Sequence, residues 1–209
     1  MSLDASCPRC LESLDFSGVD CPRHGAQPSL WRPEQASYEA FAAHLARAPD
    51  FPTYLPWPMG SGWRVSDFGV VAESSGRPVA TVTCCTGTTD PDGRVDVLVV
   101  AEETGVGLGG RCAGLAGSDP GDGFGLGPPV VRVRINSQGV PLWPVSTSTA
   151  AGELDRSVVV GEASGRWLWI VLLPASAVLL LKDEWILRDV SGDGPHLVEL
   201  PIEGPGPVW

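Results

Sequence analysis

Basic residues are scarce in this sequence, and lysine is the scarcest of them. The 209 residues include 14 lysines and arginines against 25 aspartates and glutamates, so the formal net charge is -11, and Lys182 is the only lysine. An acidic surface repels phosphate groups and releases few counterions when it binds them. We therefore expect no general binding of nucleic acid.

The sequence also lacks a hydrophobic run long enough to span a membrane. The longest apolar stretch is Trp167–Leu181, in which Ser176 is the only polar residue, whereas a spanning helix needs about 20 residues. Pro174 interrupts the stretch and would break a helix there. We expect no membrane segment and predict two buried strands instead, Trp167–Leu173 and Val178–Leu181, because strands buried on both faces are apolar without alternation.

Six cysteines are present, but they lack the dense, even spacing of a secreted disulfide framework. The start of the chain, Met-Ser-Leu-Asp-Ala-Ser, lacks the basic and apolar regions of a signal peptide. Both observations predict a protein of the reducing cytoplasm.

Glycine and proline are abundant, with 26 and 20 residues, and predict many turns between short elements. One helix is expected between Pro33 and Pro49 from apolar residues at helical spacing, which are Tyr38, Phe41, Ala42 and Leu45. Elsewhere, apolar runs alternate with turn signals and predict a meander of β-strands. The expected strands are Trp63–Ala72, Val79–Cys85, Val95–Ala101, Val130–Ile135, Val140–Val145, Ser157–Ala163, Arg166–Leu173, Val178–Leu181 and Trp185–Val190. The predicted fold class is therefore mainly β, a β-dominated α+β fold with one short helix.

These features divide the chain into four parts. Residues 1–28 hold a cluster of cysteines that we interpret as a zinc ribbon. Residues 29–62 hold the helix and a proline-rich strap, which is expected to lie extended on the neighbouring domain. Residues 63–191 are expected to form the β-rich domain. Residues 192–209 are expected to be an irregular tail, because they are rich in proline and glycine.

Four residues that commonly bind metals occur as two pairs near the start of the chain. Cys7-Pro-Arg-Cys10 and Cys21-Pro-Arg-His24 are separated by ten residues, which is long enough for a hairpin between two metal-binding knuckles. In each knuckle the backbone turns so that both side chains reach one ion. Three thiolates and one imidazole complete a tetrahedral shell without an open position, which is typical of structural zinc. The alternatives are iron, or reactive thiols without a metal.

A glycine-rich segment follows the strand expected at Val95–Ala101. Gly105, Gly107 and Gly110 satisfy the G-x-G-x-x-G pattern of dinucleotide sites. Acidic residues precede the pattern, however, and the following sequence is too short and too rich in glycine for the helix that such a site requires. The simpler interpretation is a long loop that turns tightly against the sheet. The alternative is a ligand site with four side chains at the mouth of loop 105–127, which are Glu102, Glu103, Arg111 and Cys112.

No catalytic set is recognisable in the sequence. With His24 assigned to the metal, only His44 and His196 remain as histidine bases, and neither has a marked nucleophile beside it. The eight tryptophans are more distinctive, since alternation places Trp167 and Trp169 on one face of a strand. Five of them are candidates for an aromatic surface that binds a ligand or a partner: Trp57, Trp63, Trp143, Trp167 and Trp169.

Several motifs resemble those of one protein family across nearly the whole chain. They are Cys-Pro-Arg-Cys, Cys-Pro-Arg-His-Gly, Leu-Pro-Trp-Pro, Val-Ala-Glu-Glu-Thr-Gly-Val-Gly-Leu-Gly and Gly-Glu-Ala-Ser-Gly-Arg-Trp-Leu-Trp. The chain resembles an uncharacterised family of high-GC Gram-positive (actinobacterial) bacteria, in which a zinc ribbon precedes a domain of unknown function. The resemblance implies that the ribbon ligands are Cys7, Cys10, Cys21 and His24, and it implies no activity.

These observations favour a zinc-binding cytoplasmic protein that is not an enzyme. A closed metal shell without a catalytic set is more consistent with a module that binds another protein or has a regulatory role. The alternative function is a small-molecule or nucleotide-binding protein, or a transferase-like enzyme, that uses loop 105–127.

Overall fold

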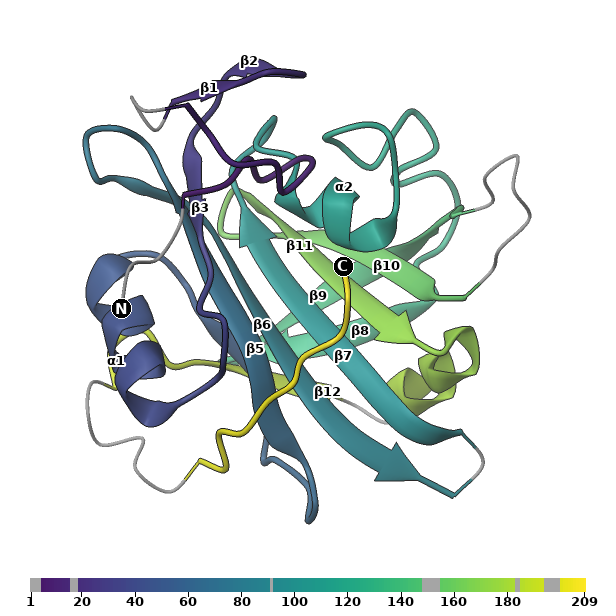
Figure 1. The fold of residues 1–209 in the computed structure, drawn as a ribbon. Coiled ribbons are helices and arrows are strands. Elements are labelled where there is room, and N and C mark those ends of the chain that lie inside the picture. The colour runs from purple at the N-terminus through teal and green to yellow at the C-terminus, as the bar shows by residue number, and fades with distance from the viewer. Residues whose placement is uncertain (1–4, 16–18, 91, 148–154, 183–184, 194–199) are drawn as a thin grey trace.

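Strands dominate the part of the chain that the computed structural model describes, which is residues 5–15, 19–90, 92–147, 155–182, 185–193 and 200–209 (Figure 1). The strands are β1 (Asp20–Cys21), β2 (Gly25–Ala26), β3 (Ser29–Trp31), β4 (Tyr54–Trp57), β5 (Arg64–Ala72), β6 (Pro78–Thr89), β7 (Gly93–Glu102), β8 (Val131–Ile135), β9 (Gln138–Val145), β10 (Ser157–Ala163), β11 (Arg166–Leu173) and β12 (Trp185–Asp189). The helices are α1 (Tyr38–Arg47), α2 (Leu108–Ala113) and the 3-10 helix η1 (Ala175–Lys182). The β-dominated fold class predicted from the sequence is confirmed.

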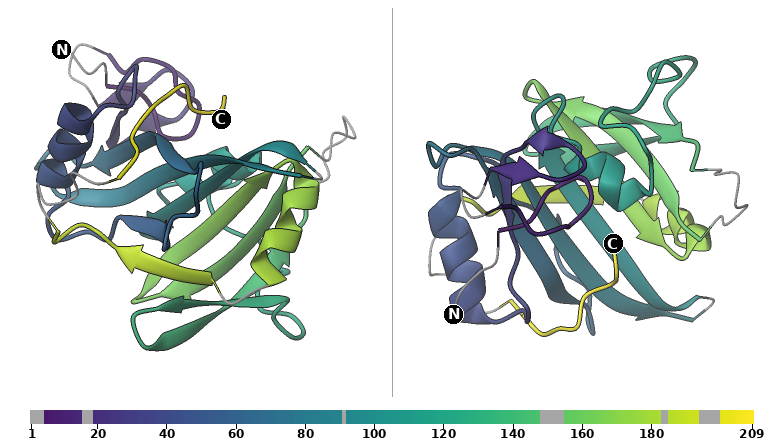
Figure 2. Two further views of the ribbon diagram at one scale, coloured as in Figure 1. Left: turned by 90° about the horizontal axis from the view of Figure 1, so that it is seen from below. Right: turned by 45° about the horizontal axis from the view of Figure 1, so that its top comes forward.

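Ten of the strands form one sheet, in the order β3-β5-β6-β7-β11-β10-β9-β8-β12-β4. Strands that are consecutive in the chain pair with each other from β5 to β7 and from β8 to β11, as expected for a meander. The sheet curls over on itself until β4 lies against β6 (Figure 2). There the hydroxyls of Thr81 and Thr83 donate hydrogen bonds to the carbonyl oxygens of Pro52 and Tyr54, at 2.5 and 2.6 Å. Side chains of β6 thus satisfy polar backbone groups along β4, at the end of the sheet.

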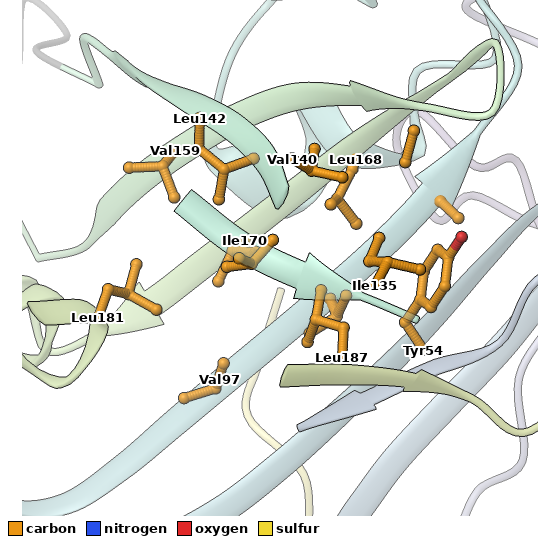
Figure 3. Close-up of a cluster of buried hydrophobic side chains, with 14 of the residues drawn as sticks. Tyr54, Val97, Ile135, Val140, Leu142, Val159, Leu168, Ile170, Leu181 and Leu187 are labelled. Atoms are coloured by element: carbon orange, nitrogen blue, oxygen red, sulfur yellow. The ribbon is translucent and has the colours of Figure 1, made fainter. Parts of the chain in front are cut away.

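Both faces of β7 and β11 are buried, because successive side chains point to opposite sides of the sheet. On the inner side, Val97 and Ile170 belong to the largest hydrophobic core, which β8, β9 and β12 also line (Figure 3). On the outer side, Leu98 and Trp169 belong to a second cluster that includes residues of α2. The strand predicted at Trp167–Leu173 is therefore apolar throughout, since neither of its faces meets water.

Helix α1 begins after Ser37, whose hydroxyl accepts a hydrogen bond from the Ala40 amide at 3.2 Å. The predicted start near Pro33 is therefore too early, and the predicted inward positions of Tyr38 and Ala42 are wrong, because both residues are exposed. A histidine takes an inward position instead and stacks on a phenylalanine of the same helix. The buried residues of the helix are Phe41, His44 and Leu45.

The strand predicted at Val178–Leu181 is wrong, because these residues belong to η1. Both edges of β11 are already paired, with β7 and β10, so the chain that follows it cannot add a strand there. Ala177 and Leu181, four residues apart, pack into the main core instead. Burial made this run apolar, but the spacing of its buried residues is helical. None of the described helices is long and apolar enough to cross a membrane.

Two segments outside the predicted β-rich domain also contribute to the fold. Strand β4 lies within the predicted proline-rich strap and pairs with β12. Residues 200–209 cross the outer face of β5 to β7 (Figure 1), where Ile202 forms a bridge with Val65 and Trp209 is buried in the second cluster. The Trp209 indole donates a hydrogen bond to Asp67 at 2.8 Å.

Candidate metal centre

Two tight turns bring the four predicted metal ligands together beside the glycine-rich loop (Figure 2). The first turn carries Cys7 and Cys10 and is closed by backbone hydrogen bonds. The second is the β1–β2 hairpin, in which Cys21 pairs with Gly25 and His24 lies in the turn between them. Gly25 has a φ of 66°, a conformation that glycine adopts without steric penalty.

The ligand atoms of Cys7, Cys10, Cys21 and His24 all lie within 4.8 Å of one another. His24 Nδ1 is 3.5 Å from the Cys7 sulfur and 3.6 Å from the Cys21 sulfur, and the Cys10 and Cys21 sulfurs are 3.6 Å apart. With Zn–S bonds of about 2.3 Å, the corners of a tetrahedron are about 3.8 Å apart. The three short distances are near this value, and the four residues are close enough to hold one metal ion.

Backbone amides point at two of the sulfurs. The sulfurs of Cys7 and Cys21 each accept hydrogen bonds from the amides two and three residues further along the chain. Burial raises the pKa of Cys7 to about 12. Burial by itself would raise the pKa of Cys21. The hydrogen bonds from the two amides and from the side chains of His24 and Cys10 together have the larger effect and lower this pKa to about 6. A bound cation would favour the thiolate form of every cysteine in the group.

The two knuckles differ in what their arginines contact. Arg9, which lies between the first two ligands, donates to the carbonyl oxygen of Gly105 at 2.5 Å and to that of Val106 at 3.3 Å. Arg23, at the same position of the second knuckle, forms an ion pair with Glu12 inside the ribbon, at 2.8 Å. The first knuckle is thus attached to the glycine-rich loop, a contact that no feature of the sequence indicated.

The glycine-rich loop folds around a carboxylate of the chain itself. The amides of Gly107, Leu108 and Gly109 hydrogen-bond to Glu102, and Glu102 Oε2 accepts from the Leu108 amide at 2.8 Å. Glu102 is fully buried, and burial raises its pKa to about 7 against the lowering effect of these amides. Helix α2 begins at Leu108, inside the glycine pattern, and is only six residues long, so the segment is short and rich in glycine as expected. Its first amides hold Glu102, so this turn offers them to a carboxylate and not to a phosphate.

The other three residues predicted at the mouth of this loop lie in different environments. Glu103 forms an ion pair with Arg77 at 2.6 Å. Cys112 is fully buried on α2, and burial raises the pKa of its thiol, which opposes a role as a nucleophile. Arg111 is partly buried, and its Nε has no hydrogen-bond partner among the described residues. The prediction that Glu102 and Cys112 belong to a binding surface is therefore wrong, because both side chains are buried in the core.

The five candidate tryptophans do not form one surface. Trp169 is fully buried beneath α2, where Gly109 lies against it so closely that a Cβ would be 2.2 Å from the indole Nε1. Trp143 and Trp167 pack edge to face on Phe124 of the loop and are covered by it in part.

Trp57 and Trp63 line a separate cleft of about 250 Å³. Trp185 lines the same cleft but was not among the five candidates. The sequence feature that could have identified it is its position as the first residue of a predicted strand. Alternation correctly placed Trp167 and Trp169 on one face, but it could not show that a loop and a helix cover that face.

Among the described residues, the histidine that does not belong to the metal-binding group is His44, and it is a core residue. His44 is buried, its Nε2 lies 3.2 Å from the Thr53 hydroxyl, and burial lowers its pKa to about 3. It stacks on Phe41 and meets Phe68 edge to face. His196 lies outside the described residues.

The fold and the site together define a class of protein, a curled β-sheet with a Cys3His metal-binding group attached at its N-terminal end. Residues 1–208 match the family of unknown function DUF6758, and the chain belongs to that family. The chain matches no curated protein and no solved structure.

Proposed function

We propose that this chain is a zinc-binding protein of the cytoplasm, in which the Cys3His group is a structural site. The protein would then act as a non-catalytic module for protein interaction or regulation. The observation that carries the proposal is the convergence of four ligand atoms, contributed by two separate turns, within 4.8 Å.

The chemistry of the four ligands favours zinc. Thiolates are soft ligands that select zinc, copper(I) or iron–sulfur clusters, and a tetrahedral group of thiolate and imidazole ligands is typical of structural zinc. When bound, zinc would supply a fixed tetrahedral centre that joins the two turns. Cys7 and Cys21 are buried, and the backbone amides two and three residues after each of them are already arranged to stabilise the thiolates. Four protein ligands leave no position open for a substrate, which supports a structural role.

The surroundings of the candidate reactive groups support a non-catalytic role. Glu102 is buried and its Oε2 accepts a hydrogen bond from the Leu108 amide, and His44 is enclosed by aromatic rings and a threonine hydroxyl. Cys112 is buried with a raised pKa. Covalent catalysis of acyl or group transfer would need a nucleophile and a base in hydrogen-bond contact at an open site, and these buried groups do not form such a pair.

Metal content measured on untagged, reduced protein tests the proposal. We expect about one zinc per chain, lost in Cys21→Ser, because three ligands hold a tetrahedral ion far more weakly than four. Cys85→Ala is the matched control, since Cys85 is a buried cysteine of β6 outside the ligand group and its variant should keep the metal. If the protein contains iron and not zinc, the site binds a metal but the assignment of zinc is wrong. If the reduced protein binds no metal, the proposal is refuted and the cysteines are redox thiols instead.

A further inference from the structure

The loop between β7 and α2 is held from two directions by groups far apart in the sequence. Arg9 of the first knuckle holds the carbonyl oxygens of Gly105 and Val106. Glu102 holds the amides of the next residues, where α2 begins. One short segment is thus fixed by one basic and one acidic side chain. Arg9 binds the carbonyl oxygens of Gly105 and Val106, and Glu102 binds the amides that follow them.

Tertiary contacts hold helix α2 in place, because the helix by itself is weak. It is only six residues long, its N-cap residue is a glycine without a side chain, and it is flanked by glycines in left-handed conformations. Helices of this length are not stable without tertiary contacts. Besides the two contacts above, Arg156 contributes by donating a hydrogen bond to the carbonyl oxygen of Cys112 at 2.9 Å. The packing that it makes is close, because Gly109 contacts the ring of Trp169 and Leu108 and Cys112 are fully buried. Small displacements of the loop would therefore open a buried apolar surface.

We propose that occupancy of the Cys3His centre by metal controls whether α2 is seated on Trp169, so that the centre acts as a metal-dependent switch of this surface. The inference rests on the proposed function in one respect, since it requires that the centre binds a metal ion. It goes further by assigning Arg9 as the residue that transmits occupancy to the loop.

The position of Arg9 explains how occupancy would be transmitted. Arg9 lies between two ligands, Cys7 and Cys10, so a bound ion fixes the backbone on both sides of it. Without the ion, the knuckle regains conformational freedom and the arginine must lose more entropy to reach the two carbonyl oxygens. The loop that it holds is rich in glycine, which has more freedom to lose than any other residue. Loss of metal would therefore release the loop before it unfolded the sheet.

The thiol of Cys112 reports directly on this release. It is fully buried on α2, whereas Cys84 and Cys85 are fully buried in β6, inside the sheet. Alkylation by N-ethylmaleimide, resolved by mass spectrometry of peptides, measures the three thiols separately. After removal of zinc by a chelator, we expect Cys112 to react about tenfold faster or more, which corresponds to the loss of one hydrogen bond from a charged donor. Cys84 and Cys85 should stay protected.

Two variants separate the role of Arg9 from that of the metal. Arg9→Ala should retain zinc but expose Cys112 even in the zinc-bound protein. Arg23→Ala is the matched control, since Arg23 has the same position in the second knuckle but forms an ion pair with Glu12 of the ribbon. Gly107→Ala changes the other side of the contact, because its Cβ would lie 3.1 Å from Arg9 at a φ of 88°. It should expose Cys112 without altering any ligand.

The outcomes distinguish the two proposals. If the protein binds no zinc, the proposed function and this inference both fail. If zinc binds but Cys112 stays protected after chelation and in Arg9→Ala, the structural zinc site stands and the switch is refuted. The switch is also refuted if Cys84 and Cys85 react together with Cys112, because the metal would then support the whole fold and not one surface.

Discussion

The neighbours of each sulfur separate the six cysteines into two chemical groups of three. Cys7, Cys10 and Cys21 turn towards one another and towards His24, and Cys84, Cys85 and Cys112 lie in hydrophobic clusters. The paired C-x-x-C/H spacing was sufficient to identify the first group, because ligand residues separated by two others on a tight turn reach one ion whatever the rest of the fold is. The second group could not be assigned from spacing, since a buried cysteine behaves as a small apolar residue.

His44 illustrates a residue whose burial has a measurable consequence for pH dependence. Its pKa falls from an ordinary 6.5 to about 3 because the charged ring would lose its hydration. Below pH 6.5 the unfolded chain binds a proton at this position and the folded chain does not, so the free energy of unfolding falls as the pH falls. The loss is about 1.4 kcal/mol per pH unit until the folded state is itself protonated.

Urea unfolding of the wild type and of His44→Phe, at several pH values between 7.5 and 4.5, tests this consequence. All other titratable groups are the same in both proteins. The difference in the free energy of unfolding between the wild type and the variant therefore isolates the contribution of His44. We expect the wild type to lose stability relative to the variant as the pH falls below 6.5. A stability difference that does not change with pH would contradict a neutral, buried His44.

Among the described secondary-structure elements, α2 is one whose existence depends on tertiary contacts. Its sequence, Leu-Gly-Gly-Arg-Cys-Ala, contains two glycines and has poor intrinsic helix propensity. Those glycines are required by packing, since a Cβ at Gly109 would lie 2.2 to 2.5 Å from three atoms of the Trp169 ring. Sequence reasoning treated the glycines as a sign of a loop because the ring that excludes a side chain comes from a strand about sixty residues later.

Substitution of Gly109 by alanine tests this explanation of α2. We expect Gly109→Ala to lower the free energy of unfolding by about 1–3 kcal/mol, because an overpacked core must shift to admit the methyl group. Gly123→Ala in the same loop is the matched control, as no heavy atom lies within 4 Å of its Cβ position and its φ is not in the left-handed region. Chemical denaturation measures both variants, and equal stabilities would show that α2 does not sit closely on Trp169.

In the whole molecule, the ribbon, α1 and the turn between β5 and β6 enclose a groove of about 1220 Å³. The ribbon is linked to β3 by paired backbone hydrogen bonds between Ser6 and Leu30. Trp31, the residue after Leu30, also lines the groove, and the Arg47 guanidinium lies over its ring, 4.8 Å from the ring centroid. Aromatic residues and arginine are enriched at protein interfaces, so we propose this groove, with Trp31 and its stacked arginine, as the surface that serves the proposed interaction role.

A photoreactive residue placed at Ala46 tests whether this groove binds a protein partner. Ala46 is exposed on α1 and lines the groove, whereas Ala43 is exposed on the same helix and does not line it. We expect cross-links to a distinct protein from position 46 and none from position 43, confirmed by binding of the purified partner. Equal cross-linking from both positions, or none from either, would count against this surface.

The sequence alone was sufficient for the features that depend on local periodicity and spacing. The ligand group was one of these, as were most of the strands, because alternation and turn residues act over a few neighbours. Tertiary structure decided which surfaces are covered. It placed Glu102 under the amides of α2, Trp169 under Gly109, and Arg9 on the carbonyl oxygens of Gly105 and Val106. The contacts of Arg9 and Trp169 join residues distant in the chain, and that of Glu102 depends on how the loop folds back over it, so no pattern of alternation or spacing predicts them.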